Sequence, residues 1–110
     1  MESTEAIFAF SALSQQLRLK ALRLLIKAGA EGLHAGEIGE QLCVRQNTMS
    51  TNLSILLRAG LVRNAREGRS VRYYADFEGI RGLLTFLMED CCGGNAALCA
   101  PVLDAIVCDC

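Results

Sequence analysis

The sequence lacks the features that mark membrane and exported proteins. No apolar run approaches the about 18 residues that a membrane-spanning helix needs. The N-terminus, Met1-Glu2-Ser3-Thr4-Glu5, is acidic and polar, which argues against a signal peptide. These absences predict a cytoplasmic protein without a membrane partner. In that compartment the six cysteines should stay reduced, which favours metal binding or redox sensing over a disulfide framework.

Catalytic groups are scarce as well. Histidine occurs once, and the sequence has no Cys-x-x-Cys pair and no phosphate-cradling loop. His34 is expected in a loop before a short helix, as a surface residue rather than a ligand. We therefore expect a binding protein and not an enzyme.

Positive charge is concentrated in the middle of the chain. The chain has 110 residues, 52% hydrophobic and 21% charged, which is typical of one globular domain. All six basic residues from 45 to 72 are arginines, opposed only by Glu67, whereas six acids and one base follow residue 75. Such a segment is often merely solvated, but it is also typical of a surface that contacts phosphate.

Apolar spacing and turn residues predict a mainly α-helical fold with a small β-hairpin. Helices are expected at 4–12, after an N-cap at Ser14 to residue 28, and at 35–42, 47–59 and 77–89. Strands are expected at 61–66 and 70–74, around the turn Glu67-Gly68-Arg69. Helix, turn, helix and hairpin in this order predict a winged helix-turn-helix.

The helix expected at 47–59 has two different sides. Met49, Leu53, Leu56 and Leu57 form an apolar stripe, whereas the other side carries small polar residues. This pattern suits a recognition helix in a DNA groove, although a solvent-facing helix would also fit. The candidate DNA-binding residues are Gln46, Asn47, Ser50, Thr51, Asn52, Ser54 and Arg58 in and beside this helix, with Arg66, Arg69 and Arg72 in the hairpin.

The terminal helix is more apolar than a single domain of this size requires. Its stripe consists of Ile80, Leu83, Leu84, Leu87 and Met88. We expect it to pack against the first helix, where Ile7, Phe8, Phe10 and Ala12 are the expected packing residues, and against a second subunit. The prediction is a homodimer that presents two recognition helices to double-stranded operator DNA.

Five of the six cysteines fall in the last twenty residues: Cys91, Cys92, Cys99, Cys108 and Cys110. Thiols at this density in a Gly-rich segment are good ligands for soft ions. We therefore divide the chain into a DNA-binding and dimerisation domain at 1–90 and a cysteine-rich, inducer-binding segment at 91–110. The sixth cysteine, Cys43, is expected to be a small buried hydrophobic residue.

Five short segments follow one another in a characteristic order: ALSQQLRL at 12–19, EI at 37–38, MSTNLSIL at 49–56, GLV at 60–62 and EGR at 67–69. On these segments the chain resembles, from about Phe8 to Leu87, the ArsR/SmtB family of small, dimeric winged-helix repressors, which leave their operator when an ion binds. Many members have histidine where this chain has Asn52. The family's best-known arsenic motif, Cys-Val-Cys-x-x-Cys, keeps only its first cysteine here, at Cys43, so that site cannot form.

The vicinal pair Cys91-Cys92, with Cys99, resembles a relocated arsenite site of one branch of the family. Trivalent arsenic binds three thiolates in a pyramid, and Gly93-Gly94 supplies a flexible spacer between the pair and the third thiol. The resemblance implies As(III) or Sb(III) as the inducer and no organic cofactor. Cys108 and Cys110 are auxiliary or incidental.

Other uses of the same thiols remain open at this stage. Cys108 or Cys110 could complete a tetrahedral zinc or cadmium site, although the zinc-branch ligands of the terminal helix are absent. A redox switch would replace the ion with disulfides. A thiol-dependent arsenate reductase or oxidoreductase is a remote alternative.

Overall fold

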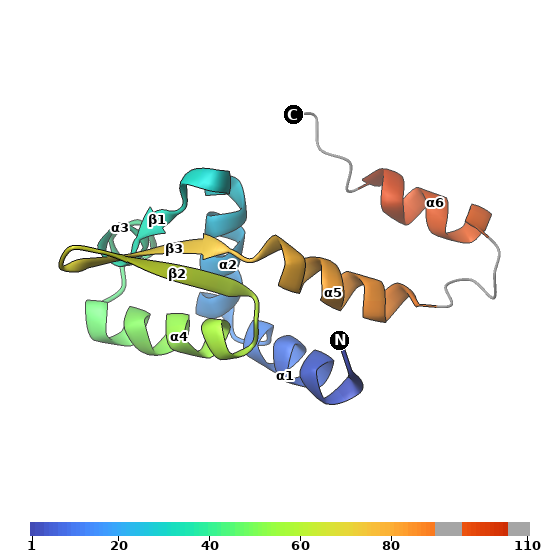
Figure 1. The fold of residues 1–110 in the computed structure, drawn as a ribbon, viewed down its shortest axis with the longest axis horizontal. Helices are drawn as coiled ribbons and strands as arrows, with labels where there is room; N and C mark the ends of the chain where they lie inside the picture. Colours follow the sequence, from blue (N-terminus) through green and yellow to red (C-terminus); the bar gives the residue numbers. More distant parts are fainter. Residues whose placement is uncertain (90–95, 106–110) are drawn as a thin grey trace.

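The computed structural model describes residues 1–89 and 96–105 (Figure 1). This part of the chain forms six α-helices, one 3-10 turn and three short strands. The elements are α1 (Ser3–Leu13), α2 (Gln16–Ala28), the 3-10 turn η1 (Gly29–Glu31), β1 (Leu33–His34), α3 (Ala35–Leu42), α4 (Gln46–Arg58), β2 (Val62–Glu67), β3 (Ser70–Ala75), α5 (Phe77–Met88) and α6 (Ala96–Ala105). The five predicted helices and the hairpin are confirmed, with shifts of one or two residues at their ends. Strand β1 and helix α6 were not predicted.

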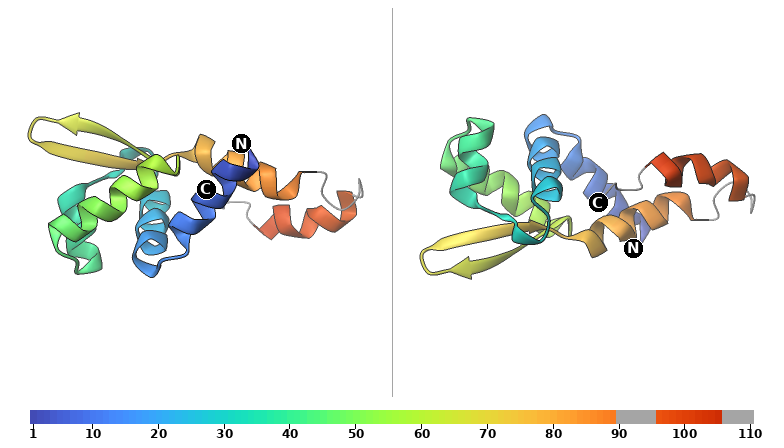
Figure 2. Two further views of the ribbon diagram at one scale, coloured as in Figure 1. Left: turned by 90° about the horizontal axis from the view of Figure 1, so that it is seen from below. Right: turned by 90° about the horizontal axis from the view of Figure 1, so that it is seen from above.

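The three strands form one antiparallel sheet in the order β1-β3-β2. Strands β2 and β3 pair along their full length, from Val62 opposite Ala75 to Glu67 opposite Ser70. This hairpin, the wing, projects beyond the helices, and α4 runs beside it (Figures 1 and 2). Strand β1 adds only Leu33 and His34 to the other edge of β3, which is too short a segment to show a strand pattern in the sequence.

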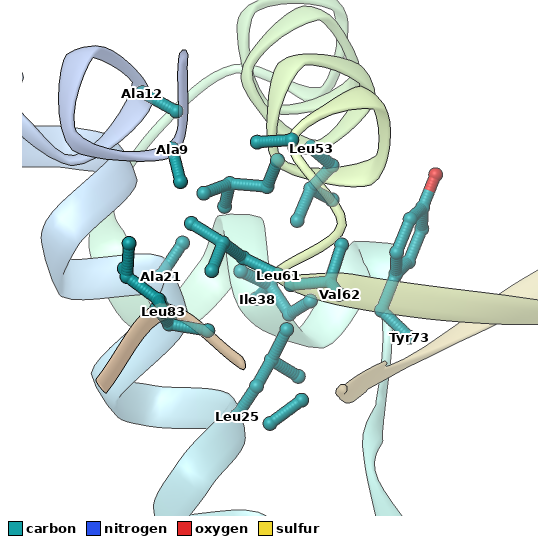
Figure 3. Packing of buried hydrophobic residues seen from close by; sticks show 14 of the residues in the cluster. Ala9, Ala12, Ala21, Leu25, Ile38, Leu53, Leu61, Val62, Tyr73 and Leu83 are labelled. Carbon is teal, nitrogen blue, oxygen red and sulfur yellow. The ribbon is translucent and has the colours of Figure 1, made fainter. Parts of the chain in front are cut away.

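The core is built around α4 and α2. The largest fully buried side chains are Leu25, Ile38, Met49, Leu53, Leu56 and Leu61. In Figure 3, labelled side chains from α1, α2, α3, α4, β2 and α5 converge on this centre. Burying one such side chain contributes about 1.5–3 kcal/mol, so these six account for much of the stability. The predicted apolar stripe of α4 is confirmed.

The expected packing residues of α1 are only partly right. Ala6, Ala9 and Ala12 are the residues that α1 buries, whereas Ile7 is 67% exposed and Phe8 and Phe10 also lie in solvent. Alanines at a spacing of three lie on one side of α1, and their short side chains are the ones that face the core. The large side chains of α1 lie on its other sides. Helix α5 behaves similarly, since it buries Leu83 while Leu87 is 58% exposed.

Two further sequence expectations are wrong at helix ends. Ser14 ends α1, where its Oγ donates to the carbonyl of Ser11 at 2.6 Å, and the N-cap of α2 is Gln15. Cys43 is exposed, not buried, because it ends α3 in the left-handed conformation with φ of 57°. Gly39 is packed closely, since a Cβ there would lie 3.1 Å from the carbonyl oxygen of Val44.

Glycine in the first turn of α5 allows that helix to contact the end of α4. A Cβ added to Gly79 would overlap the carbonyl oxygen of Gly60, whereas a Cβ on Gly82 would make ordinary contacts with Met1. We predict that Gly79→Ala lowers the free energy of unfolding by about 1–3 kcal/mol, as overpacking does. The control Gly82→Ala should be neutral or stabilising by up to about 1 kcal/mol, because alanine is the better helix former.

Urea unfolding followed by circular dichroism, at one protein concentration, measures both changes. An equal effect of the two substitutions would show that the contact between Gly79 and Gly60 does not constrain α5.

Candidate nucleic-acid interface and thiol segment

Helix α4 presents a continuous polar side to solvent. Six of the seven candidate residues in and near it are exposed: Gln46, Asn47, Ser50, Thr51, Ser54 and Arg58. The opposite side is fixed by Met49, Leu53 and Leu56, each 0% exposed. The helix therefore cannot rotate to hide its polar side without exposing its apolar one. A set of hydroxyl, amide and guanidinium groups held in this way can form hydrogen bonds to base edges and phosphates.

Asn52 is the exception among these residues. It is only 8% exposed and lies about 100° further round the helix than Thr51. Its Oδ1 accepts a hydrogen bond from Arg18 at 2.9 Å, and its Nδ2 donates to the carbonyl of Thr48 at 2.9 Å. Each end of the amide therefore has a partner inside the protein, and this geometry does not support the prediction that Asn52 contacts DNA.

The register of the wing sorts its arginines onto two faces. Side chains alternate along a strand, and Arg66 lies opposite Val71, on the face that also carries the buried Tyr73. This face is turned toward the helix-turn-helix. Arg72 directly follows Val71 in β3, so its side chain lies on the other face, together with Arg63 and Tyr74. Arg63 stacks there on the Tyr74 ring, with its guanidinium carbon 4.4 Å from the ring centroid.

Arg72 is engaged within the protein. Its Nε lies 3.1 Å from both carboxylate oxygens of Glu67, and its Nη1 donates to the carbonyl of Glu31 at 2.9 Å. His34 completes the cluster, with its Nε2 2.7 Å from Arg72 and 3.3 Å from Glu67. The hydrogen bond to Glu67 raises the pKa of Arg72 above its ordinary value. Arg72 therefore ties the wing to β1, and its predicted role as a free phosphate contact is not supported by this geometry.

A groove of about 480 Å³ separates the wing from the helix-turn-helix. It is lined by His34, Ala35, Gly36, Glu37, Glu40, Gln46, Ser50, Arg69, Ser70, Val71 and Tyr73. Gln46 and Ser50 belong to the exposed side of α4, and Arg69 lies at the tip of the wing. The groove thus brings together residues that are about twenty positions apart in sequence. Glu37 and Glu40 line its other edge, so its positive charge comes from the wing.

The thiols are placed only in part. Cys91, Cys92, Cys108 and Cys110 lie outside the described residues, and Cys99 lies in α6, which follows α5 in the chain (Figure 1). Among residues 1–89 and 96–105 no group of three His, Cys, Asp or Glu side chains could hold a metal ion. His34, the single histidine, is half-buried and engaged with Arg72 and Glu67 rather than with a thiol.

Comparison with known proteins also indicates a helix-turn-helix transcriptional regulator. No protein-family model matches the chain. YbzH of Bacillus subtilis, named as an uncharacterized HTH-type transcriptional regulator, is 38% identical over 98 residues, covering 78% of this chain and 98% of YbzH. The transcriptional activator HlyU of Vibrio cholerae is 27% identical over 93 residues, covering 84% of this chain and 83% of HlyU.

Solved structures extend this similarity. An ArsR-like transcriptional regulator from Rhodococcus sp. RHA1 has a TM-score of 0.69 at 26% identity, covering 94% of this chain and 90% of the other. The chain belongs to the ArsR/SmtB family of winged-helix transcriptional regulators.

Two further structures of this ArsR/SmtB type bear on its assembly and chemistry. Mb0332 from Mycobacterium bovis, described as a homodimeric winged helix-turn-helix DNA-binding domain, has a TM-score of 0.62 at 26% identity, with 79% and 81% of the two chains covered. Reduced HlyU from Vibrio cholerae has a TM-score of 0.62 at 26% identity, with 82% and 92% covered.

The relatives are transcriptional regulators, so the predicted class, a regulator and not an enzyme, is confirmed. No helix in the described part of this ArsR/SmtB regulator is long and apolar enough to cross a membrane.

Arg69 and Arg72 of this ArsR/SmtB regulator are expected to differ in their contribution to DNA affinity. Arg69→Gln should weaken DNA binding and reduce the slope of log K against log salt by about 0.9, as the loss of one phosphate contact does. Arg72→Gln should leave that slope unchanged, because Glu67 and Glu31 hold the side chain inside the protein. Fluorescence anisotropy with a labelled promoter fragment at several salt concentrations measures both. A drop in slope for Arg72→Gln equal to that for Arg69→Gln would contradict this assignment.

Proposed function

We propose that this regulator is a dimeric repressor that leaves its operator when As(III) or Sb(III) binds thiolates of the C-terminal segment. The observation that carries the proposal is the position of the thiols. The vicinal pair Cys91-Cys92 begins three residues after the end of α5, and Cys99 lies eight residues after Cys91. An ion that joins these three would act directly at the end of α5, the helix that exposes Leu84 and Leu87.

The DNA-reading role falls to α4 and one face of the wing. Gln46, Asn47, Ser50 and Thr51 lie on the exposed side of α4 and are suited to base edges in a major groove. Ser54 and Arg58 continue that side toward the end of the helix. Arg66, on the wing face that is turned toward α4, and Arg69, at the tip of the wing beside the groove, would hold the adjacent phosphates or minor groove.

The dimer interface is proposed on α1 and α5, which pack against each other. Their exposed large apolar residues are Ile7, Phe8 and Phe10 on α1 and Phe77, Leu84 and Leu87 on α5. This much apolar surface on two adjoining helices is typical of an interaction site. The homodimeric relative Mb0332 supports a second copy of the chain as the partner. A two-fold dimer would place the two α4 helices about 34 Å apart, one turn of DNA.

A charge introduced into this surface should break the dimer. We predict that Leu87→Glu gives a monomer in sedimentation velocity at micromolar concentration and abolishes specific DNA binding, because a carboxylate cannot be buried there unpaired. Thr85→Glu is the matched control, since Thr85 is also exposed on α5 but faces away from the leucines. A dimer that persists in Leu87→Glu would place the interface elsewhere.

The chemistry of the thiols favours a trivalent metalloid. Arsenite takes three thiolates and needs no fourth ligand, whereas zinc needs a closed tetrahedral set. Three cysteines within nine residues match the first requirement. Site closure would fix the shape of the chain just beyond α5 and shift the two α4 helices out of register with the operator. A coupling of about 1–3 kcal/mol per ligand is typical and would empty many operator sites.

Release from DNA tests the proposal. Reduced protein bound to its own promoter fragment is titrated with arsenite, antimonite, zinc and cadmium, with anisotropy as the readout. We expect release by arsenite and antimonite, and loss of that response in Cys91→Ser and Cys92→Ser. Cys43→Ser is the control, because Cys43 is exposed at the end of α3 and far from this segment in sequence. In vitro transcription gives the direction, which matters because the relative HlyU is named an activator.

A redox switch is the second candidate, supported by a relative whose structure is described as reduced HlyU. In that case peroxide alone would release the DNA, and dithiothreitol would restore binding. Release by zinc or cadmium without a response to arsenite would instead assign a divalent-metal site that includes Cys108 or Cys110.

A further inference from the structure

Three elements meet at the side chain of Arg18, at the start of α2. Its Nε donates to the carbonyl of Ala12 at 2.7 Å, and its Nη1 donates to Asn52 Oδ1 at 2.9 Å. Asn52 in turn donates to the carbonyl of Thr48, within α4. The backbone N–H of Arg18 is also bound, by the side chain of Gln15 at 3.1 Å. One guanidinium thus connects the last turn of α1 to the middle of α4.

This connection is specific to an arginine. The last carbonyls of a helix have no partners within it and carry the negative end of its dipole, so a cation beside Ala12 is well placed. No carboxylate among the described residues forms an ion pair with Arg18. Its Nε and Nη1 instead donate to neutral oxygens on two different helices. The planar guanidinium presents two N–H groups from two different nitrogen atoms in a fixed geometry, which the single nitrogen of a lysine does not reproduce.

We propose that Arg18 and Asn52 are positioning residues that set the orientation of α4 relative to α1, and through it control the affinity for specific DNA. The proposal rests on the proposed use of α4 as the recognition helix. Helix α1 carries the exposed Ile7, Phe8 and Phe10 in its middle and the Ala12 carbonyl in its last turn. A shift of α1 is therefore passed to α4 by hydrogen bonds rather than by apolar contacts alone.

A double-mutant cycle in DNA binding tests the proposal without any inducer. Arg18→Met and Asn52→Leu are each expected to weaken specific binding about tenfold, and the double variant no more than either single one, because both remove the same link. The salt slope should stay at the wild-type value in all three, since neither side chain contacts phosphate. Arg23→Met, which removes an exposed cation of the same helix, is the matched control and should not be coupled to Asn52.

Asn52→Asp separates positioning from base reading. A carboxylate at 52 can still accept from Arg18, so this variant should bind DNA more tightly than Asn52→Leu, and the advantage should vanish in the Arg18→Met background. If the side chain at 52 faced DNA, Asn52→Asp would instead bind more weakly than Asn52→Leu, because the phosphates would repel a carboxylate. If circular dichroism shows that Arg18→Met is unfolded, Arg18→Lys replaces it in the cycle, because it keeps the charge but not the guanidinium geometry. The loss of DNA affinity in Arg18→Lys should again not add to the loss in Asn52→Leu.

Three results would overturn the proposal. The first is that the losses of DNA affinity in Arg18→Met and Asn52→Leu add up in the double variant. The others are that Asn52→Asp binds DNA more weakly than Asn52→Leu, or that the variants lose discrimination at only a single base pair of the operator. Wild-type protein that binds its promoter but does not respond to arsenite would overturn the inducer assignment alone and leave this cycle valid.

Discussion

Burial of one side of α4 is the constraint on which the DNA-facing surface depends. Met49, Leu53 and Leu56 are completely buried against α2 and α3, and this fixes the rotation of the helix about its own axis. Small polar residues such as Ser50 and Thr51 are mediocre helix formers, so the exposed side contributes little to the stability of α4. The helix is held by its core side, which leaves the other side free to carry residues chosen for hydrogen bonding. A change in the core would therefore weaken DNA binding without touching a base-reading residue.

The wing obeys a second constraint, the alternation of side chains along paired strands. Arg66 and Arg72 have the same chemistry, yet the register places them on opposite faces, and only Arg66 shares a face with Tyr73 toward the helix-turn-helix. Arg72 then becomes structural, because Glu67 and the Glu31 carbonyl satisfy it midway along the wing. A count of positive charges along the sequence overstates the DNA-binding surface, since one of the three predicted wing arginines holds the wing in place.

The same distinction explains how far the sequence alone could lead. Periodicity located the helices, the hairpin and the buried stripe of α4, because these depend on local spacing. It failed where a side chain's role is decided by a partner far away in the sequence. Asn52 is the clearest case, since its partner Arg18 is 34 positions away and no pattern links the two. Ile7 and Phe8 were predicted as packing residues of the first helix, whereas Ala6 and Ala9 are the residues that α1 buries within the subunit. The ArsR/SmtB resemblance was confirmed, while the thiol site stays a prediction.

The geometry also limits how an ion near residue 91 could act on DNA. Helix α5 packs on α1, and α1 is joined to α4 through Arg18 and Asn52. Each link is a packed helix or a satisfied hydrogen bond, and together they form a continuous connection from α5 to α4 within one subunit. Spatial continuity alone does not establish such a route, because coupling requires an element with two arrangements that both sites favour differently. The link between α1 and α4 can supply such an element: the Arg18 fork either holds both acceptors or releases one, and a released polar group is costly when buried. Inducer binding at the end of α5 would then need to shift only this one equilibrium to alter the affinity for DNA.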